Sequence, residues 1–226
     1  MRARLRILRI SAIGLLLAFS ACARTQQTPS VTASGFLKDY SMLTPGGPNE
    51  AQYRYINPKA NLKAYDKILI EPVVIFPGPK SKLAQVPPED QRELVTYLQS
   101  TVVSRLSEDY TFVGQPGPGV MRLRAAITEA RKSRPVLDLV TTVVPFGLLA
   151  SSAKRLVTGT HSFVGGAAIE MEILDSMSGE RLMAAVDERA GSKALRGKLR
   201  TWDDVKDAYD YWAERFATRL AELRAR

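Results

Sequence analysis

Residues 167–189, AAIEMEILDSMSGERLMAAVDER, carry the pattern that decides the fold. In the first part apolar and charged residues alternate, with Ile169 and Ile173 on one side and Glu170 and Glu172 on the other. Alternation with a period of two is typical of a strand that buries one face. The central DSMSG favours a turn, and RLMAAVDER continues as a second run. The stretch therefore predicts a β-hairpin whose two glutamates face outward.

The sequence before this hairpin contains further short apolar runs and one long amphipathic stretch. Residues 67–75, 110–113 and 120–130 are predicted strands, and Pro72 bends the first of them or places its second half at an edge. Residues 89–107 begin with acids and then repeat apolar residues at four-residue spacing. This pattern predicts a helix that packs on a sheet.

The C-terminal stretch gives the clearest helical pattern. Asp203 and Asp204 suit the positive end of a helix dipole, and apolar residues then recur every three or four positions. Both tryptophans, Trp202 and Trp212, lie on this apolar stripe. We expect the stripe to cover the sheet; the alternative is a surface for binding a partner.

Taken in order, these elements predict an α/β fold of the α+β type. We expect a single layer of mostly antiparallel sheet, of about four to five strands, covered by two main helices, one of them C-terminal. Residues 35–72 scatter aromatic residues among Pro, Gly and Asn and are predicted to form an irregular lead-in over the surface. Residues 35–226 are expected to form one domain.

The N-terminus predicts export. Four arginines without an acid precede the apolar run ISAIGLLLAF at residues 10–19. This order is typical of a signal peptide, here residues 1–21, and the run is about half of the ~20 residues that a membrane-spanning helix needs. The tetrapeptide FSAC, which ends at Cys22, resembles the bacterial lipobox, apart from a Phe where Leu is most frequent.

The lipobox resemblance implies cleavage before Cys22 and attachment of acyl chains such as palmitate to it. Ala23 follows, rather than the Asp that retains lipoproteins in the inner membrane, so in a Gram-negative bacterium the resemblance implies lipid anchoring to the outer membrane, facing the periplasm. Cys22 is the only cysteine, so no disulfide or free thiol is expected in the mature chain. Residues 22–34 are polar and small, and predict a flexible, disordered tether.

The charge balance is modest once the signal is removed. The formal net charge is +9 for the full chain and +5 without the four arginines of the signal. An exported protein of this kind is not expected to bind nucleic acid, and we interpret the charges as a solvated surface.

One segment is unusual: residues 139–153, LVTTVVPFGLLASSA, contain no charge and are interrupted by a proline and a glycine. A connection of this length is often functional. It either packs into the core or forms an exposed flap that meets lipid, a lipid-like ligand or a second copy of the chain. As a possible apolar binding segment we single out Leu139, Val143, Val144, Pro145, Phe146, Leu148 and Leu149.

The sequence offers little for catalysis. His161 is the only histidine, so it has no histidine or free cysteine with which to share a metal, and no G-x-S-x-G motif supplies a nucleophile. Asp187 and Glu188 are neighbours on a predicted strand and therefore point to opposite faces, which makes them a poor acid–base pair. We expect no catalytic residue, no metal and no cofactor, and hence no enzyme.

Several features resemble a bacterial outer-membrane lipoprotein family that carries a domain of unknown function. They are the GFLxDYSxL opening from Gly35 to Leu43, Tyr55 with Pro58, Tyr65 ahead of Ile68 and Pro72-Val73, the apolar Val144-Pro145, and the terminal Trp202-x-x-Val205…Tyr211-Trp212-Ala213. The resemblance runs from about residue 35 to the end and carries no catalytic residue across.

These observations favour a non-enzymatic binding or accessory module of the cell envelope. We expect it to meet the membrane through the acyl chains on Cys22 and to bind an envelope protein, with its oligomeric state left open. The alternative is a lipid or amphiphile carrier that uses residues 139–153, and a third hypothesis is a cell-wall hydrolase.

Overall fold

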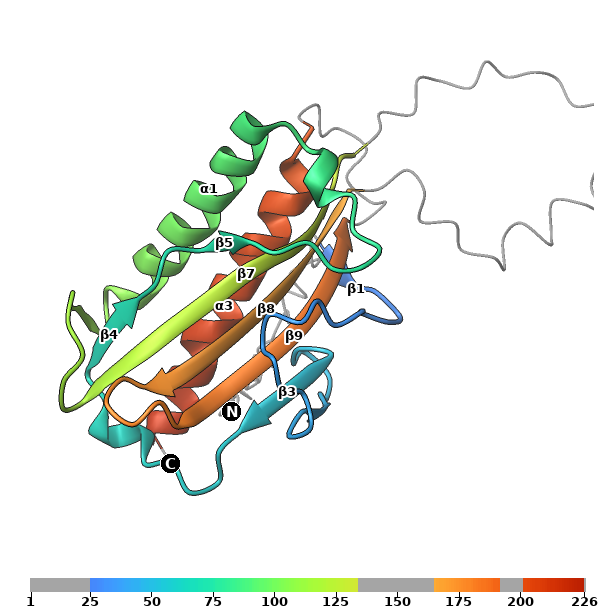
Figure 1. Cartoon of the computed structure of the whole chain (residues 1–226). Helices are drawn as coiled ribbons and strands as arrows, with labels where there is room; N and C mark the ends of the chain where they lie inside the picture. Colours follow the sequence, from blue (N-terminus) through green and yellow to red (C-terminus); the bar gives the residue numbers. More distant parts are fainter. Residues whose placement is uncertain (1–24, 134–164, 192–200, 226) are drawn as a thin grey trace, which may run out of the picture.

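The computed structural model describes residues 25–133, 165–191 and 201–225. These residues form one nine-stranded mixed sheet with two long helices on one face (Figure 1). The α+β class and the two covering helices are as predicted, whereas the sheet has more strands than the sequence indicated.

The strands are β1 (Thr25–Gln27), β2 (Thr44–Pro45), β3 (Tyr53–Ile56), β4 (Lys67–Ile70), β5 (Val74–Ile75), β6 (Thr111–Phe112), β7 (Val120–Arg131), β8 (Gly166–Asp175) and β9 (Arg181–Gly191). The helices are α1 (Pro88–Leu106) and α3 (Asp203–Ala225), with short 3-10 helices η1 (Leu62–Ala64) and η2 (Leu83–Gln85).

The sheet is antiparallel on one side of β7 and parallel on the other. Its order is β2-β3-β9-β8-β7-β4-β6, with β1 also paired to β9 and β5 also paired to β7. β4 and β5 both pair with β7 in parallel, and Pro72 stands in the gap between them. The predicted run over residues 67–75 is thus divided at its proline, as expected.

The predicted hairpin forms the centre of the sheet as β8 and β9, paired from Gly166↔Ala190 to Leu174↔Arg181. Its turn is held by Asp175, whose Oδ1 accepts the backbone N–H of Met177 at 3.0 Å and that of Ser178 at 2.7 Å. This is the side-chain turn chemistry that the DSMSG sequence favours.

The two helices run in the same direction along one face of the sheet (Figure 1). Two ion pairs join the helices in the same order along each of them. Lys206 of α3 pairs with Glu93 of α1 at 2.6 Å, and further along Glu214 of α3 pairs with Arg105 of α1 at 3.1 Å. The apolar stripe of α3 faces the sheet, as predicted.

Both tryptophans are buried in that layer. Trp202 is 5% exposed and Trp212 is 8% exposed. They therefore belong to the core that α3 forms with the sheet, and the alternative of a partner-binding tryptophan stripe is wrong.

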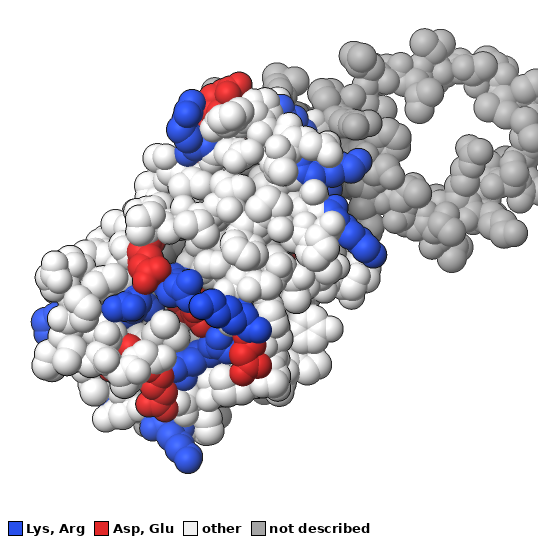
Figure 2. Space-filling model, in the orientation of Figure 1, with Lys and Arg blue, Asp and Glu red and all other residues white. Residues whose placement is uncertain are grey.

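The lead-in covers part of the opposite face. Phe36 and Leu37 pack on Ala126, Ala184 and Val186, which point away from the helices. Figure 2 shows this face: its middle is formed largely by uncharged residues, and charged side chains gather towards the hairpin turn. The lead-in also contributes β2 and β3 to the sheet, so it is more regular than predicted.

The prediction that the glutamates of β8 face outward is only half right. Glu170 points away from the helices but is 0% exposed, because the lead-in lies over it. Its carboxylate accepts the backbone N–H of Ser34 at 2.5 Å, the backbone N–H of Leu37 at 3.3 Å and the hydroxyl of Tyr40 at 2.6 Å. Residues of the GFLxDYSxL opening thus serve to satisfy a buried carboxylate.

Glu172 is buried on the same face and is paired with arginines. Arg124 of β7 donates to one carboxylate oxygen, and Arg181 donates from Nε to the other at 2.9 Å. Arg181 also donates to the backbone carbonyls of Leu37 and Asp39, at 2.9 and 2.8 Å. The arginine therefore links the acid in the sheet to the lead-in above it.

The predicted tether over residues 22–34 is not borne out along its described part. Thr25–Gln27 forms β1, which pairs with β9, and Thr28 continues the contact by donating its N–H to the Glu188 carbonyl at 2.9 Å. Burial of the Thr25 side chain explains why this polar stretch is ordered against the sheet.

A buried hydroxyl on α3 gives a test of the core. The Tyr209 side chain is 0% exposed and its hydroxyl has no hydrogen-bond partner among the described residues, whereas Tyr97 donates its hydroxyl to Asp210 at 3.0 Å. We expect Tyr209→Phe to raise the free energy of unfolding by about 1 kcal/mol, because it removes an unsatisfied polar group. The matched change Tyr97→Phe should lower it by about 0.5–1.5 kcal/mol. Urea unfolding followed by circular dichroism measures both, and a loss of stability in Tyr209→Phe would contradict the assignment.

Candidate functional site

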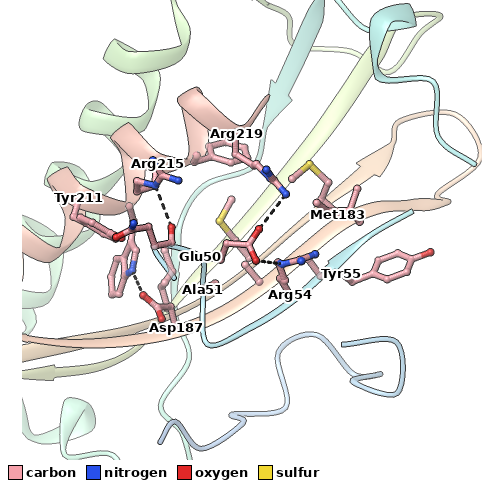
Figure 3. A pocket seen from close by; sticks show the side chains of 17 residues that line it. Glu50, Ala51, Arg54, Tyr55, Met183, Asp187, Tyr211, Arg215 and Arg219 are labelled. Atoms are coloured by element: carbon pink, nitrogen blue, oxygen red, sulfur yellow. Dashed lines mark hydrogen bonds and ion pairs between the residues drawn. The ribbon is translucent and has the colours of Figure 1, made fainter. Parts of the chain in front are cut away.

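A pocket opens on the helix face, between α3 and the strands β3, β8 and β9 (Figure 3). Its volume is about 110 Å³, and its wall is mostly apolar. The main apolar side chains that line it are Ile56, Ile169, Met171, Met183, Trp212 and Phe216.

Three arginines and one glutamate also line the pocket. Arg54 comes from β3, Arg215 and Arg219 come from successive turns of α3, and Glu50 lies between them (Figure 3). Glu50 binds Arg54 through Oε2 at 2.5 Å and Arg219 through Oε1 at 3.0 Å. With Asp187, which also lines the pocket, the lining has three arginines against two carboxyl groups, a formal excess of one positive charge next to apolar walls.

Glu50 belongs to a tight turn that joins β2 to β3. Gly46 is required there, because a Cβ at this position would lie 1.9 Å from the carbonyl oxygen of Ala51. The Gly47 N–H donates to Glu50 Oε2 at 2.8 Å, and Arg215 Nε donates to the carbonyl of Asn49 at 3.2 Å. The turn is thus fastened to α3 at two points.

These contacts lower the pKa of Glu50 from its usual range. The backbone N–H of Gly47 has the largest effect, and the guanidinium groups of Arg54 and Arg219 add to it. Glu50 is accordingly charged at neutral pH and neutralises part of the arginine charge.

A buried carboxylate lies at the inner end of the pocket. Asp187 of β9 is 2% exposed, and it accepts Trp212 Nε1–H at 2.7 Å, Gln27 Nε2–H at 2.6 Å and the backbone N–H of Gln52 at 3.0 Å. It connects α3, β1 and the start of β3. Burial raises the pKa of Asp187, and the three hydrogen bonds and Arg189 oppose that effect.

Asp187 and Glu188 point to opposite faces of β9, as the sequence predicted. Asp187 meets α3, whereas Glu188 pairs with Arg131 of β7 at 2.7 Å. Each carboxylate is committed to a separate structural contact, so the two do not form an acid–base pair.

Arg189, which follows Glu188 on β9, binds Thr25, the first described residue of the chain. Arg189 donates from Nε to Thr25 Oγ1 at 2.7 Å and from Nη2 to the Thr25 carbonyl at 3.1 Å. Its guanidinium also stacks on the ring of Tyr211, 3.6 Å from the centroid. β1 and α3 are therefore joined through a single buried arginine.

The other residues singled out from the sequence lie outside the described residues. These are Cys22, His161 and the apolar segment 139–153 with Leu139, Val143, Val144, Pro145, Phe146, Leu148 and Leu149. Within the described parts of the chain, no helix is long and apolar enough to cross a membrane. In those same parts, no group of three or more His, Cys, Asp or Glu residues is arranged to hold a metal ion.

Sequence reasoning missed the pocket because four separate segments build it. The turn at residues 49–51, β3, the β8–β9 hairpin and α3 each contribute side chains. One signal was readable: Arg215 and Arg219 are four residues apart on the predicted helix, so they share a face.

The arrangement is that of a small α+β domain with an apolar pocket lined by arginines, a class of site suited to binding. The chain belongs to the family described as "Protein of unknown function (DUF3313)", whose model matches residues 32–216. The match begins just before the GFLxDYSxL opening and ends at Phe216.

The chain is also similar to a lipoprotein in sequence and to solved structures in fold. The chain is 26% identical over 185 residues to the uncharacterized lipoprotein YdcL of Escherichia coli (strain K12), covering 81% of this chain and 82% of that protein. Among solved structures, the PelC dodecamer from Paraburkholderia phytofirmans is similar with a TM-score of 0.40 and 11% identity, over 73% of this chain and 94% of that one. A neuraminyllactose-binding hemagglutinin homologue from Helicobacter pylori gives a TM-score of 0.33 and 9% identity, over 80% and 90%.

The buried carboxylate gives a pH-dependent prediction. We expect Asp187→Asn to lower the free energy of unfolding by about 1–3 kcal/mol near neutral pH, because one of the three donors then faces an amide N–H. Burial raises the pKa of folded Asp187 above its unfolded value. The wild-type protein therefore gains stability relative to the variant as the pH falls from about 7 towards about 4, and the deficit of the variant grows.

Asp175 provides a matched control of opposite sign. The N–H of Ser178 lowers the pKa of Asp175 in the folded state, so the advantage of wild type over Asp175→Asn is present near neutral pH and is lost as the pH falls. Urea titrations at several pH values measure both differences. A deficit of Asp187→Asn that shrinks towards acidic pH would contradict the account of a carboxyl group that burial destabilises.

Proposed function

We propose that this chain is an outer-membrane lipoprotein, anchored through Cys22 and facing the periplasm, whose domain acts as a non-enzymatic binding or accessory module of the cell envelope. Support for the anchor comes from the order of the N-terminus: arginines, an apolar run, small residues and a cysteine. The similarity to an E. coli lipoprotein points the same way.

The observation that carries the binding role is the pocket between α3 and β3. It combines apolar walls with Arg54, Arg215 and Arg219, and its carboxylates, Glu50 and Asp187, are engaged in hydrogen bonds that hold the fold together. Such a site suits an apolar group with a negative or hydrogen-bond-accepting end, because arginine offers several donors in a fixed geometry. A side chain or chain terminus of an envelope protein has this chemistry.

The same geometry favours a second candidate, a carrier for a small amphiphile. The apolar residues 139–153 were the predicted site for that role, whereas the described pocket supplies both an apolar wall and cationic groups by itself. An amphiphile with an anionic head would place its apolar part against Met171 and Met183 and its head at the arginines. The volume of about 110 Å³ limits the apolar part to a short group.

The anchor is tested by two substitutions in a Gram-negative host. We expect Cys22→Ser to abolish incorporation of labelled palmitate and to remove the protein from the membrane fraction, because no other cysteine can accept the acyl chains. We expect Ala23→Asp to move it from the outer-membrane to the inner-membrane fraction of a sucrose gradient, while the control Ala23→Ser stays in place. A Cys22→Ser protein that still sediments with membranes would refute the proposed anchor.

The pocket is tested by filling it. Ala185 lines the pocket, and we expect Ala185→Leu to reduce the bound fraction of any retained ligand or partner by roughly tenfold, because added volume clashes with the occupant. The matched control is Ala221→Leu, the same change at an exposed position of α3.

Native mass spectrometry of the protein extracted in mild detergent gives the readout. A stoichiometric second protein that Ala185→Leu loses supports the accessory module, and a small-molecule mass that it loses supports the carrier. Retention of the same species by both variants would remove the pocket from the proposal. Release of fragments from purified cell wall by wild type, but not by Ala185→Leu, would favour the hydrolase instead.

A further inference from the structure

The register of β1 determines where the chain leaves the sheet. Thr25 pairs with Gly191 and Gln27 pairs with Arg189 in an antiparallel arrangement. β1 therefore enters the sheet at the C-terminal end of β9 and runs inward. Thr25, the first described residue, therefore lies beside Gly191 at this end of the sheet.

The proposed anchor lies close to that point. Cys22 precedes Thr25 by three residues, and an extended chain spans at most ~3.3–3.6 Å per residue. The acylated sulfur is thus attached to backbone within roughly 10 Å of Thr25. This is much shorter than the tether of about 20 Å that thirteen free residues would give.

Thr25 itself has little freedom to move. Its side chain is 2% exposed, and Arg189 holds both its hydroxyl and its carbonyl. Gln27 donates to Asp187 at 2.6 Å and to the Glu50 carbonyl at 3.0 Å. The start of β1 is accordingly part of the rigid domain, and the anchor cannot swing to another side of it.

Other strand ends lie in the same row. Ala190 pairs with Gly166, and Gly166 pairs with Arg131, so the ends of β9 and β7 and the start of β8 are neighbours of Thr25. α1 also begins at this end of the molecule, because Lys132 pairs with Asp90 at 3.1 Å. We call the end of the sheet marked by Thr25, Arg131, Gly166 and Gly191 the anchor end.

We propose that the anchor end faces the membrane surface, with the strands of the sheet pointing away from the bilayer and the β8–β9 turn at the far end. This orientation rests on the proposed acylation of Cys22. β8 has ten residues, so the far end lies about 30 Å from the anchor end. The pocket between α3 and β3 lies along the side of the domain and stays accessible from the periplasm.

The unique cysteine makes the test direct. Because acylation consumes Cys22, a cysteine placed elsewhere is the only free thiol and takes a single fluorophore. Glu89 and Glu108 are both exposed and lie at the beginning and just past the end of α1, whose length is about 28 Å. The variants Glu89→Cys and Glu108→Cys thus place the same label at the anchor end and at the far end. Lys132→Cys and Met177→Cys form a second pair on the sheet.

The acylated protein is reconstituted in vesicles of phosphatidylethanolamine and phosphatidylglycerol that contain a headgroup-labelled quencher lipid. We expect quenching at Glu89→Cys and Lys132→Cys to be at least threefold stronger than at Glu108→Cys and Met177→Cys. Equal quenching of both ends, or stronger quenching at the far end, would overturn the orientation.

Flotation of the same samples separates the two ideas. Vesicles that float with the protein but quench both ends equally reject the orientation and leave the anchor intact. Protein that fails to float, as the Cys22→Ser variant should, rejects the anchor itself. Circular dichroism of each labelled variant verifies that it is folded, and the two pairs must agree for the orientation to stand.

Discussion

The structure depends on the burial of carboxylates in the central hairpin. Glu170, Glu172 and Asp187 lie on β8 and β9 and are each at most 3% exposed. A buried charge without partners costs several kcal/mol, so each must be surrounded by donors. Most of these donors come from outside the hairpin, and they hold the irregular N-terminal part in place: Ser34, Leu37 and Tyr40 on one face, and Gln27 and Gln52 with Trp212 of α3 on the other.

This dependence explains which parts of the fold the sequence could predict. The strands β7 to β9 and both helices follow from apolar periodicity, because each buries one regular face. Periodicity also placed Glu170 and Glu172 on the correct side of β8, but it treats a charged residue as solvated and cannot see that a distant segment lies over it. The strands β1 and β3 were not predicted for the same reason, because their pairing with β9 is set by side chains such as Arg189 rather than by a local pattern.

Part of the information was nevertheless present in the sequence. Arg124 and Glu172 lie opposite each other on β7 and β8, and a pair of complementary charges on one face indicates a network rather than a solvated surface.

The same network holds the stretch that follows the proposed lipidation site. Arg189 and Asp187 are two residues apart on β9 and point to the same side. One holds Thr25 and the other holds Gln27, so the stretch that follows the proposed lipidation site is fixed by the core itself. A polar sequence that composition alone predicts to be a tether thus becomes a strand because two partners for it are buried in the sheet. If Cys22 is acylated as proposed, only a short stretch of chain separates the acyl groups from the rigid domain.

The position of the pocket follows from the widths of the two layers, whereas its chemistry does not. Strands lie about 4.8 Å apart and packed helices about 10 Å apart, so two helices cover roughly four strands. Across the middle of this sheet the order is β3-β9-β8-β7-β5, which is one strand more. Because α1 packs near β5 and α3 lies over β8 and β9, β3 extends past the edge of α3 and leaves a hollow there.

A hollow that arises from geometry alone needs only apolar residues to close it. Arg54, Arg215 and Arg219 go beyond that requirement, because they outnumber the two carboxyl groups of the lining, Glu50 and Asp187. The arginines of the pocket are therefore the feature that packing does not explain, and they are the basis of the proposed binding of a negative group.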